Sequence, residues 1–263
     1  MNIQLSDHFN YKKLFLFTLP SVVMMVFTSV YCVVDGFFVS NFAGKTAFAA
    51  INLIMPFIMI LGGIGFMIGT GGSALVSYTL GTGDKEKANR YFSMMVYFTI
   101  LAGILLTVLG IIFVRPIAEL FGADESMMDT CVLYGRIVIA FNAAFMLQNI
   151  FQSFFVVAEK PRLGLIVTIA AGVTNMVLDA LFVGVFKWGI VGAALATGIS
   201  QSIGGLLPLL YFALPNNSPL QLTRTGFELA PLLKASSNGC SELMSNVASS
   251  LIGIVYNYQL MRL

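Results

Sequence analysis

The sequence has few charged residues, and this scarcity excludes most classes of soluble protein. Only 10% of its 263 residues are charged, whereas 58% are hydrophobic and the mean hydropathy is +0.89. A typical soluble domain is about 25% charged and about 45–50% apolar. The formal net charge is only +2, so no overall basic field favours nucleic acid as a partner. The composition predicts an all-α integral membrane protein.

Patterns that bind metals, cofactors or nucleotides are also lacking. The three cysteines, Cys32, Cys131 and Cys240, are far apart, and His8 is the single histidine. This spacing argues against zinc, haem and disulfide frameworks, and we interpret the cysteines as small buried hydrophobic residues. No G-x-x-x-x-G-K-[ST] sequence occurs, so ATP-driven pumping has no support. We therefore expect no cofactor.

Long apolar segments dominate the chain instead. A spanning helix needs about 20 mostly apolar residues, and seven segments qualify: about 13–40, 48–80, 91–114, 130–157, 163–186, 190–213 and 231–259. The first is too long for a signal peptide and is expected to remain in the protein. The second contains Pro56 and the stretch "GGIGFMIGTGG", which predicts a kinked or closely packed helix.

The polar stretches suggest how the chain is divided. Residues 1–215 are expected to form a six-helix lobe, 216–230 a cytoplasmic linker, and 231–263 the first helix of a second lobe. A transporter made of two six-helix halves would show this pattern if it were cut after its seventh helix. Nine of the 14 lysines and arginines fall on the side of the N-terminus, which favours a cytoplasmic N-terminus in the cell membrane.

Three acidic residues lie inside apolar segments, where a charge costs at least about 2.5–3.5 kcal/mol. At a rise of about 1.5 Å per residue, Asp35 lies about 33 Å beyond Lys13 and Asp179 about 25 Å beyond Arg162. Both depths belong to the outer half of the membrane, so the two carboxylates could share one cavity. Glu242 lies only about 12 Å beyond its nearest basic residue and is expected in a separate, inner region.

Neutral oxygens accompany the two aspartates. Asn175 is four residues before Asp179 and therefore on the same helix face, while Asn149 and Thr197 are at intermediate depth. Two carboxylates with amide and hydroxyl oxygens suit a proton or a hard cation such as Na⁺. Two simpler interpretations stay open: intramembrane acids often accept hydrogen bonds between helices, and Tyr134 could be an aromatic anchor at the membrane interface.

Four motifs in order resemble one transporter family. They are "VVDGFFVSNFAG", "GTGGSALVSYTLGTGDKEKANRYF", "QNIFQSFFVVAEKPRLG" and "NMVLDALFVGVFKWGIVGAALATGISQ". Together they resemble the multidrug and toxic compound extrusion (MATE) family, and within it the bacterial DinF- and MepA-like branch. The resemblance covers essentially the whole chain. The chain, however, covers only the N-terminal lobe and the seventh helix of such a twelve-helix transporter.

The resemblance implies a function and a set of sites. Members are secondary active exporters that exchange organic, often cationic compounds for H⁺ or Na⁺ across a cavity between two lobes. It implies ion coupling, with a candidate Na⁺ site, at Asp35, Asn175, Asp179 and Thr197. It also implies a substrate cavity at Tyr134, Asn149 and Glu242, although the family's "PSG" before that glutamate is "SNG" here.

The implied partners are small hydrophobic organic cations or other xenobiotics, the lipid bilayer and a complementary second lobe. Two alternatives remain from the sequence. One is a lipid-linked oligosaccharide flippase of the same superfamily, which tends to carry more cations inside. The other is a non-transporting half that associates with a partner chain. An intramembrane enzyme is disfavoured because the chain has neither a DDxxD motif nor a placed Ser–His or Ser–Lys pair.

Overall fold

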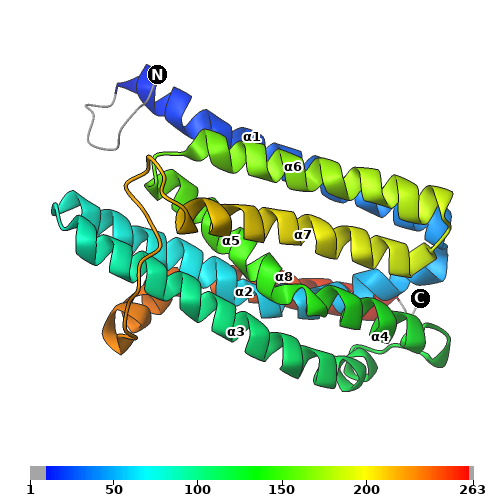
Figure 1. Ribbon diagram of the computed structural model, residues 1–263. Coiled ribbons are helices and arrows are strands. Elements are labelled where there is room, and N and C mark those ends of the chain that lie inside the picture. Colours follow the sequence, from blue (N-terminus) through cyan, green and yellow to red (C-terminus); the bar gives the residue numbers. More distant parts are fainter. Residues whose placement is uncertain (1–9, 261–263) are drawn as a thin grey trace.

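A computed structural model describes residues 10–260 and shows a bundle of long helices (Figure 1). The elements are α1 (Tyr11–Phe38), η1 (Val39–Ala43), α2 (Lys45–Gly81), α3 (Lys85–Leu120), α4 (Glu125–Ala140), α5 (Asn142–Val157), α6 (Pro161–Asp179), η2 (Ala180–Val185), α7 (Gly189–Ala213) and α8 (Leu229–Leu260). The two η elements are short π-helices. His8 and Arg262 lie outside the described residues.

The predicted all-α membrane fold is confirmed. Within the described residues, five helices are long and apolar enough to cross a membrane, or six if the bent pair α4 and α5 forms one span. The single helix predicted over 130–157 was wrong in detail, because α4 and α5 meet at a bend of 53° around Phe141. The ring of Phe141 packs directly on Gly198 of α7, where a side chain of any size would collide with it.

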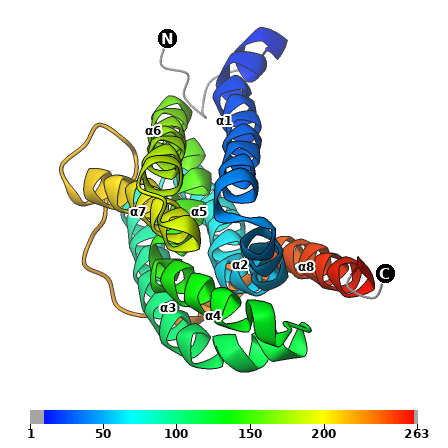
Figure 2. The same ribbon diagram turned by 90° about the vertical axis from the view of Figure 1, so that its right-hand side faces the viewer.

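The seventh predicted segment forms the 32-residue helix α8, which is not among the helices that are apolar enough to be identified as membrane spans. Serines and asparagines interrupt its hydrophobic sequence between residues 235 and 250. α8 packs mainly along α2 (Figure 2). It is therefore long enough to cross a membrane, but its composition alone does not identify it as a span.

Local signals in the sequence explain where several helices begin. The side chains of Asn10, Asp84 and Asp124 accept hydrogen bonds from backbone N–H groups three residues later, at 2.8, 3.0 and 3.0 Å. Such N-caps satisfy amide groups that have no partner inside the helix. Gly44, with φ of 95°, lies between η1 and α2, in a backbone region that favours glycine.

The glycines of α2 let neighbouring helices approach closely, as the sequence predicted. A methyl group added at Gly65 would lie 2.8 Å from Met146 Cα, and one added at Gly69 would lie 3.1 Å from Ile150 Cα, both on α5. A methyl group at Gly71 would collide with the carbonyl oxygen of Ala235 on α8. α2 remains one continuous helix through Pro56. Small residues thus place α2 between α5 and α8.

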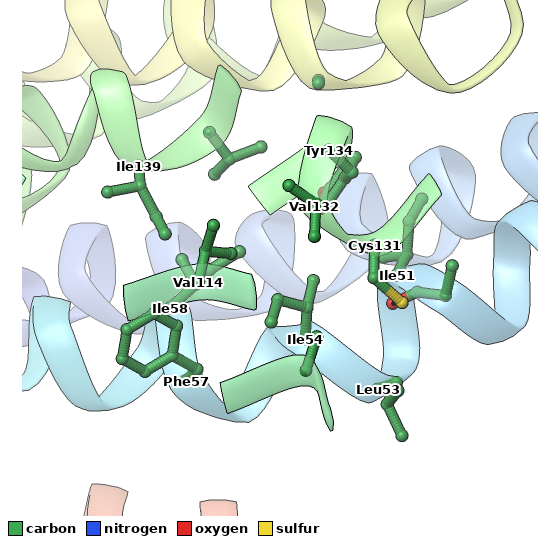
Figure 3. Close-up of a cluster of buried hydrophobic side chains, with 14 of the residues drawn as sticks. Ile51, Leu53, Ile54, Phe57, Ile58, Val114, Cys131, Val132, Tyr134 and Ile139 are labelled. Carbon is green, nitrogen blue, oxygen red and sulfur yellow. Dashed lines mark hydrogen bonds between the residues drawn. The ribbon is translucent and has the colours of Figure 1, made fainter. Parts of the chain in front are cut away.

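Buried side chains gather in two apolar clusters. The first joins α2, α3 and α4 around Ile54, Val114 and Cys131 (Figure 3). The second contains five phenylalanines from α3, α5 and α7, whose neighbouring ring centroids lie 4.8 to 5.6 Å apart: Phe92, Phe151, Phe154, Phe155 and Phe212. These rings fill the core, which accounts for part of the chain's high phenylalanine content.

The interpretation of all three cysteines as buried residues was correct for Cys131 and wrong for Cys32 and Cys240. The two exposed cysteines lie on α1 and α8, which pack against the bundle along one side only (Figure 2). In the apolar window of α1, only 6% of residues are buried inside the chain. The rest of α1 presents hydrophobic side chains outward, as expected for a helix that faces lipid or another protein surface.

Residues 214–228 connect α7 to α8 and form no helix, and the part from Gln221 to Glu228 is attached to α3. The backbone N–H of Gln221 donates to Asn89 Oδ1 at 2.9 Å, and the N–H of Thr223 donates to Ser93 Oγ at 2.8 Å. Arg90 and Glu228 form an ion pair at 2.7 Å. We call residues 214–228 the connecting segment. Its second part is therefore fixed to α3 before α8 begins.

Candidate functional site: a carboxylate pair between α1 and α6

The two helices that carry the intramembrane aspartates lie side by side. α1 and α6 both start at the same end of the bundle and run in the same direction (Figure 1). They approach closely because Gly172 of α6 faces the rings of Phe27 and Tyr31, and a methyl group there would lie 2.9 Å from Tyr31 Cδ1. From this contact, one further turn of α1 reaches Asp35 and two further turns of α6 reach Asp179. The shared direction therefore brings the two acids to similar depth.

The side chains of Asp35 and Asp179 interact with each other across this contact. Asp179 is completely buried. In the described part of the chain, neither of its carboxyl oxygens has a hydrogen-bond partner, and the same is true of Asp35 Oδ1. A buried carboxylate without a partner carries a large desolvation cost. The pair therefore has unused capacity to bind a proton or a cation.

Three other predicted residues surround the pair. Asn175 lies one turn before Asp179 and is buried, and its Oδ1 also lacks a partner within residues 10–260. Tyr134 of α4 is almost completely buried at the border of the first cluster (Figure 3) and lies within electrostatic range of both acids. Its hydroxyl group interacts with the side chain of Thr197 on α7. The structure thus brings residues from α1, α4, α6 and α7 together.

The burial of Tyr134 argues against its interpretation as an interfacial anchor. An anchor exposes its polar end to the membrane surface, but Tyr134 is only 1% exposed. Its aromatic ring belongs to the apolar cluster and its hydroxyl belongs to the polar site. Tyr134 is therefore placed to connect core packing with the carboxylate pair.

The other two predicted residues lie elsewhere. Asn149 is buried on α5, where its carbonyl oxygen is close to Gly69 of α2, and its Nδ2 has no partner in the described chain. Glu242 is half-buried on α8, one turn before Asn246, whose side chain donates to its carbonyl oxygen at 2.9 Å. Because α8 packs mainly on α2, Glu242 belongs to a region apart from the pair, as its depth in the sequence suggested.

Sequence reasoning did not predict the π-helices beside the acids. η1 starts four residues after Asp35, and η2 starts directly after Asp179. The two π-helices contact each other, and Phe38 at the end of α1 reaches Gly184 of η2. Single π-helical turns within α-helices are often found at functional sites. Both acids therefore lie where the regular helical hydrogen-bond pattern changes.

Comparison with known proteins identifies the family. The family model named MatE matches residues 20–181, which is more than half of the chain and includes both aspartates.

This chain belongs to the MatE family.

Curated family relatives include the multidrug export protein MepA of Staphylococcus saprophyticus, which is 26% identical over 202 residues. MepA of Staphylococcus haemolyticus is 25% identical over 208 residues. These alignments cover 77% and 79% of this chain but only 45% and 46% of the relatives. The chain thus spans about half the length of the curated relatives that it matches.

Solved structures of the family share the fold. A MATE transporter in complex with MaD3S matches with a TM-score of 0.85 over 91% of this chain and 55% of that chain, at 20% identity. An outward-facing multidrug resistance transporter of the family matches at 0.84 and an inward-facing one at 0.80, each at 20% identity. They cover 91% and 86% of this chain, and 54% and 52% of those chains. With its several apolar helices, the chain is a multi-pass membrane protein that shares the fold of MATE transporters over about half of their length.

Proposed function

We propose that this chain is the N-terminal half of a secondary active exporter that exchanges organic compounds for H⁺ or Na⁺. The observation that carries the proposal is the pair of Asp35 and the completely buried Asp179, in which three of the four carboxyl oxygens are buried and lack hydrogen-bond partners in the described chain. Relatives over this region are named multidrug export proteins, which supports xenobiotics as the substrate class. Small hydrophobic organic cations are the substrates that we would test first.

The coupling ion would bind at the carboxylate pair. A proton would be shared between Asp35 and Asp179, whereas Na⁺ would also use the oxygens of Asn175 and Thr197, because Na⁺ prefers several hard oxygen ligands. Either ion would reduce the charge that the pair buries. Transport follows if the occupied and empty site favour different arrangements of the two lobes, since an ion shifts an equilibrium only through such a difference.

The other residues have proposed roles that depend on their positions. Tyr134 would couple the charge of the carboxylate pair to the packing of the apolar core, because it belongs to the core cluster and lies within electrostatic range of both acids. Asn149 and Glu242 would line the substrate path rather than the ion site. We place the N-terminus and residues 216–230 in the cytoplasm of a cell-membrane protein. Residues 1–215 would form the first lobe and residues 231–263 would begin the second.

A solved structure from Pyrococcus furiosus shows why the fold alone does not choose the function. Reverse polarity of its binding pocket suggests a different function of that transporter, yet its structure matches this chain with a TM-score of 0.84 at 20% identity. In the present chain the charge at the buried site comes from acids, whereas Arg136 lies in α4 with an exposed side chain. Acidic polarity supports ion-coupled export over the flippase alternative.

Export of a fluorescent organic cation tests the proposal. Cells that produce this chain would be compared with cells producing Asp179→Asn, which keeps the size of the side chain and removes its charge. Asp129→Asn is the matched control, because Asp129 is exposed on α4. At equal membrane levels, we expect export to be lost with Asp179→Asn and retained with Asp129→Asn. Export that survives Asp179→Asn would contradict the assigned ion site.

Absence of export from the unsubstituted chain would show that the described lobe is insufficient alone. The same three variants would then be placed in a chain that includes a complete second lobe. To distinguish the ions, proteoliposomes would receive either a pH gradient or a Na⁺ gradient. A gradient that drives uptake of the cation in the unsubstituted protein and not in Asp179→Asn identifies the ion.

A further inference from the structure

A cleft of about 640 Å³ lies at the end of the bundle where α1 begins. It is bounded by the first turns of α1, the turn between α5 and α6, and the end of α7 with the residues after it. Asp35 is 15 residues beyond Pro20, the deepest α1 residue of the cleft, which corresponds to about 22 Å along the helix. The cleft is therefore separate from the carboxylate pair.

The polar side of the cleft is cationic. Lys160 and Arg162 both line it, and neither forms an ion pair in the described structure. Glu159 also lines the cleft but takes part in an interaction of its own. Asn216 is held in place, because its Nδ2 donates to the carbonyl oxygens of Tyr211 and Leu214, each at 3.1 Å. Lys160 and Arg162 therefore lie in a cleft with Asn216, whose side chain is held by hydrogen bonds, and both cations are available to bind an anion.

The apolar side of the cleft continues along the bundle. Leu16 of α1 and Ile166 of α6 line the cleft and are 37% and 61% exposed. Exposed hydrophobic residues follow each of them at helical spacing: Leu19 and Val23 on α1, and Ile169 and Val173 on α6. Residues three and seven positions apart lie on the same face of a helix. Each helix therefore carries an exposed apolar stripe that starts at the cleft.

We propose that this cleft binds the headgroup of an anionic phospholipid. Its phosphate lies between Lys160 and Arg162, and its acyl chains follow the apolar stripes of α1 and α6. Basic pockets between membrane helices near the membrane surface are suited to anionic headgroups. A free phosphate would use the cations alone, whereas a phospholipid matches both the cations and the stripes that begin beside them.

Binding of lipids to the purified 263-residue chain tests this proposal. Native mass spectrometry from a neutral detergent would count bound phosphatidylglycerol and, separately, bound phosphatidylcholine. We expect phosphatidylglycerol to bind more tightly. The double variant Lys160→Gln/Arg162→Gln should weaken that binding by about 30-fold, because each cation near the membrane surface contributes about fivefold. Its binding of phosphatidylcholine should change little.

The matched control is Lys85→Gln/Arg224→Gln, which removes one lysine and one arginine that are exposed outside the cleft. It should leave phosphatidylglycerol binding within about twofold of the unsubstituted chain. Equal loss in both double variants would overturn the site, because net charge would then explain the binding. Equal binding of the two lipids to the unsubstituted chain would overturn it without any variant. Displacement by water-soluble glycerol phosphate at the same concentrations would show an anion site rather than a lipid site, and would also overturn the proposal.

Discussion

Substitution of Gly239 on α8 tests the close packing of α8 against α2. A methyl group at Gly239 would collide with the carbonyl oxygen of Met67 on α2, and would lie 2.8 Å from its carbonyl carbon and 3.0 Å from Gly71 N. All three atoms belong to the backbone, so no side-chain rotation can relieve the collision. Gly239→Ala must therefore push α8 away from α2.

The expected cost combines two opposing effects. Overpacking of this kind costs about 1–3 kcal/mol, while alanine stabilises a helix by about 1 kcal/mol relative to glycine. A net destabilisation of up to about 2 kcal/mol follows. At roughly 2–4 °C per kcal/mol for a chain of this size, the melting temperature should fall by up to about 8 °C.

Thermal unfolding in detergent would measure this change, with Gly81→Ala as the control. Gly81 ends α2 and no atom lies within 4 Å of the added methyl group, so this variant should be as stable as the unsubstituted chain or slightly more so. Hydrogen exchange would locate the effect, because amide protection should decrease in α8 and not in α6. If Gly239→Ala matched or exceeded Gly81→Ala in stability, the close packing of α2 and α8 would be refuted.

Three further predictions concern the carboxylate pair, the connecting segment and the start of α4. If the pair acts as one unit, Asp35→Asn and Asp179→Asn should each abolish ion-driven transport, and the double variant should be no worse than either; additive losses would contradict a single site. Ser93→Ala should destabilise the chain by about 1–3 kcal/mol, because it leaves the backbone N–H group of Thr223 unpaired. Arg90→Gln should cost less than about 1 kcal/mol, because its ion pair with Glu228 is exposed. Chemical denaturation would compare the stability of the two variants. Hydrogen bonds from Ser126 and the Met127 N–H group lower the pKa of the Asp124 carboxyl group. Its contribution to the start of α4 should therefore be present at neutral pH and lost as the pH falls through the lowered pKa; amide exchange of residues 125–128 would follow this loss, and Asp124→Asn should show no such pH dependence.

Much of the candidate site could be predicted from the sequence, because the depth of a residue in a membrane helix follows from its position along that helix. A rise of about 1.5 Å per residue placed Asp35 and Asp179 in the same half of the membrane, and the structure shows that they meet. The same arithmetic separated Glu242 from them. Helical spacing placed Asn175 on the face of Asp179. These predictions needed only local sequence and the direction of each helix.

Features that depend on distant contacts could not be predicted in this way. The bend at Phe141 accompanies its contact with Gly198, which lies 57 residues later in the chain. The exposure of Cys32 and Cys240 depends on how few helices pack around α1 and α8, and their local sequences resemble those of buried helices. The π-helices after the two aspartates also lack a recognisable pattern of residue types, so they could not be predicted from the sequence.

The attachment of the connecting segment to α3 determines how much free tether joins the bundle to α8. Fifteen unattached residues could span about 50 Å when extended, which would leave α8 almost independent of the helices before it. The ion pair at Glu228 instead comes one residue before α8 begins. The chain that can move freely between this ion pair and α8 is therefore about one residue long. A displacement of α8 along the bundle must either move α3 with it or first break the ion pair between Arg90 and Glu228.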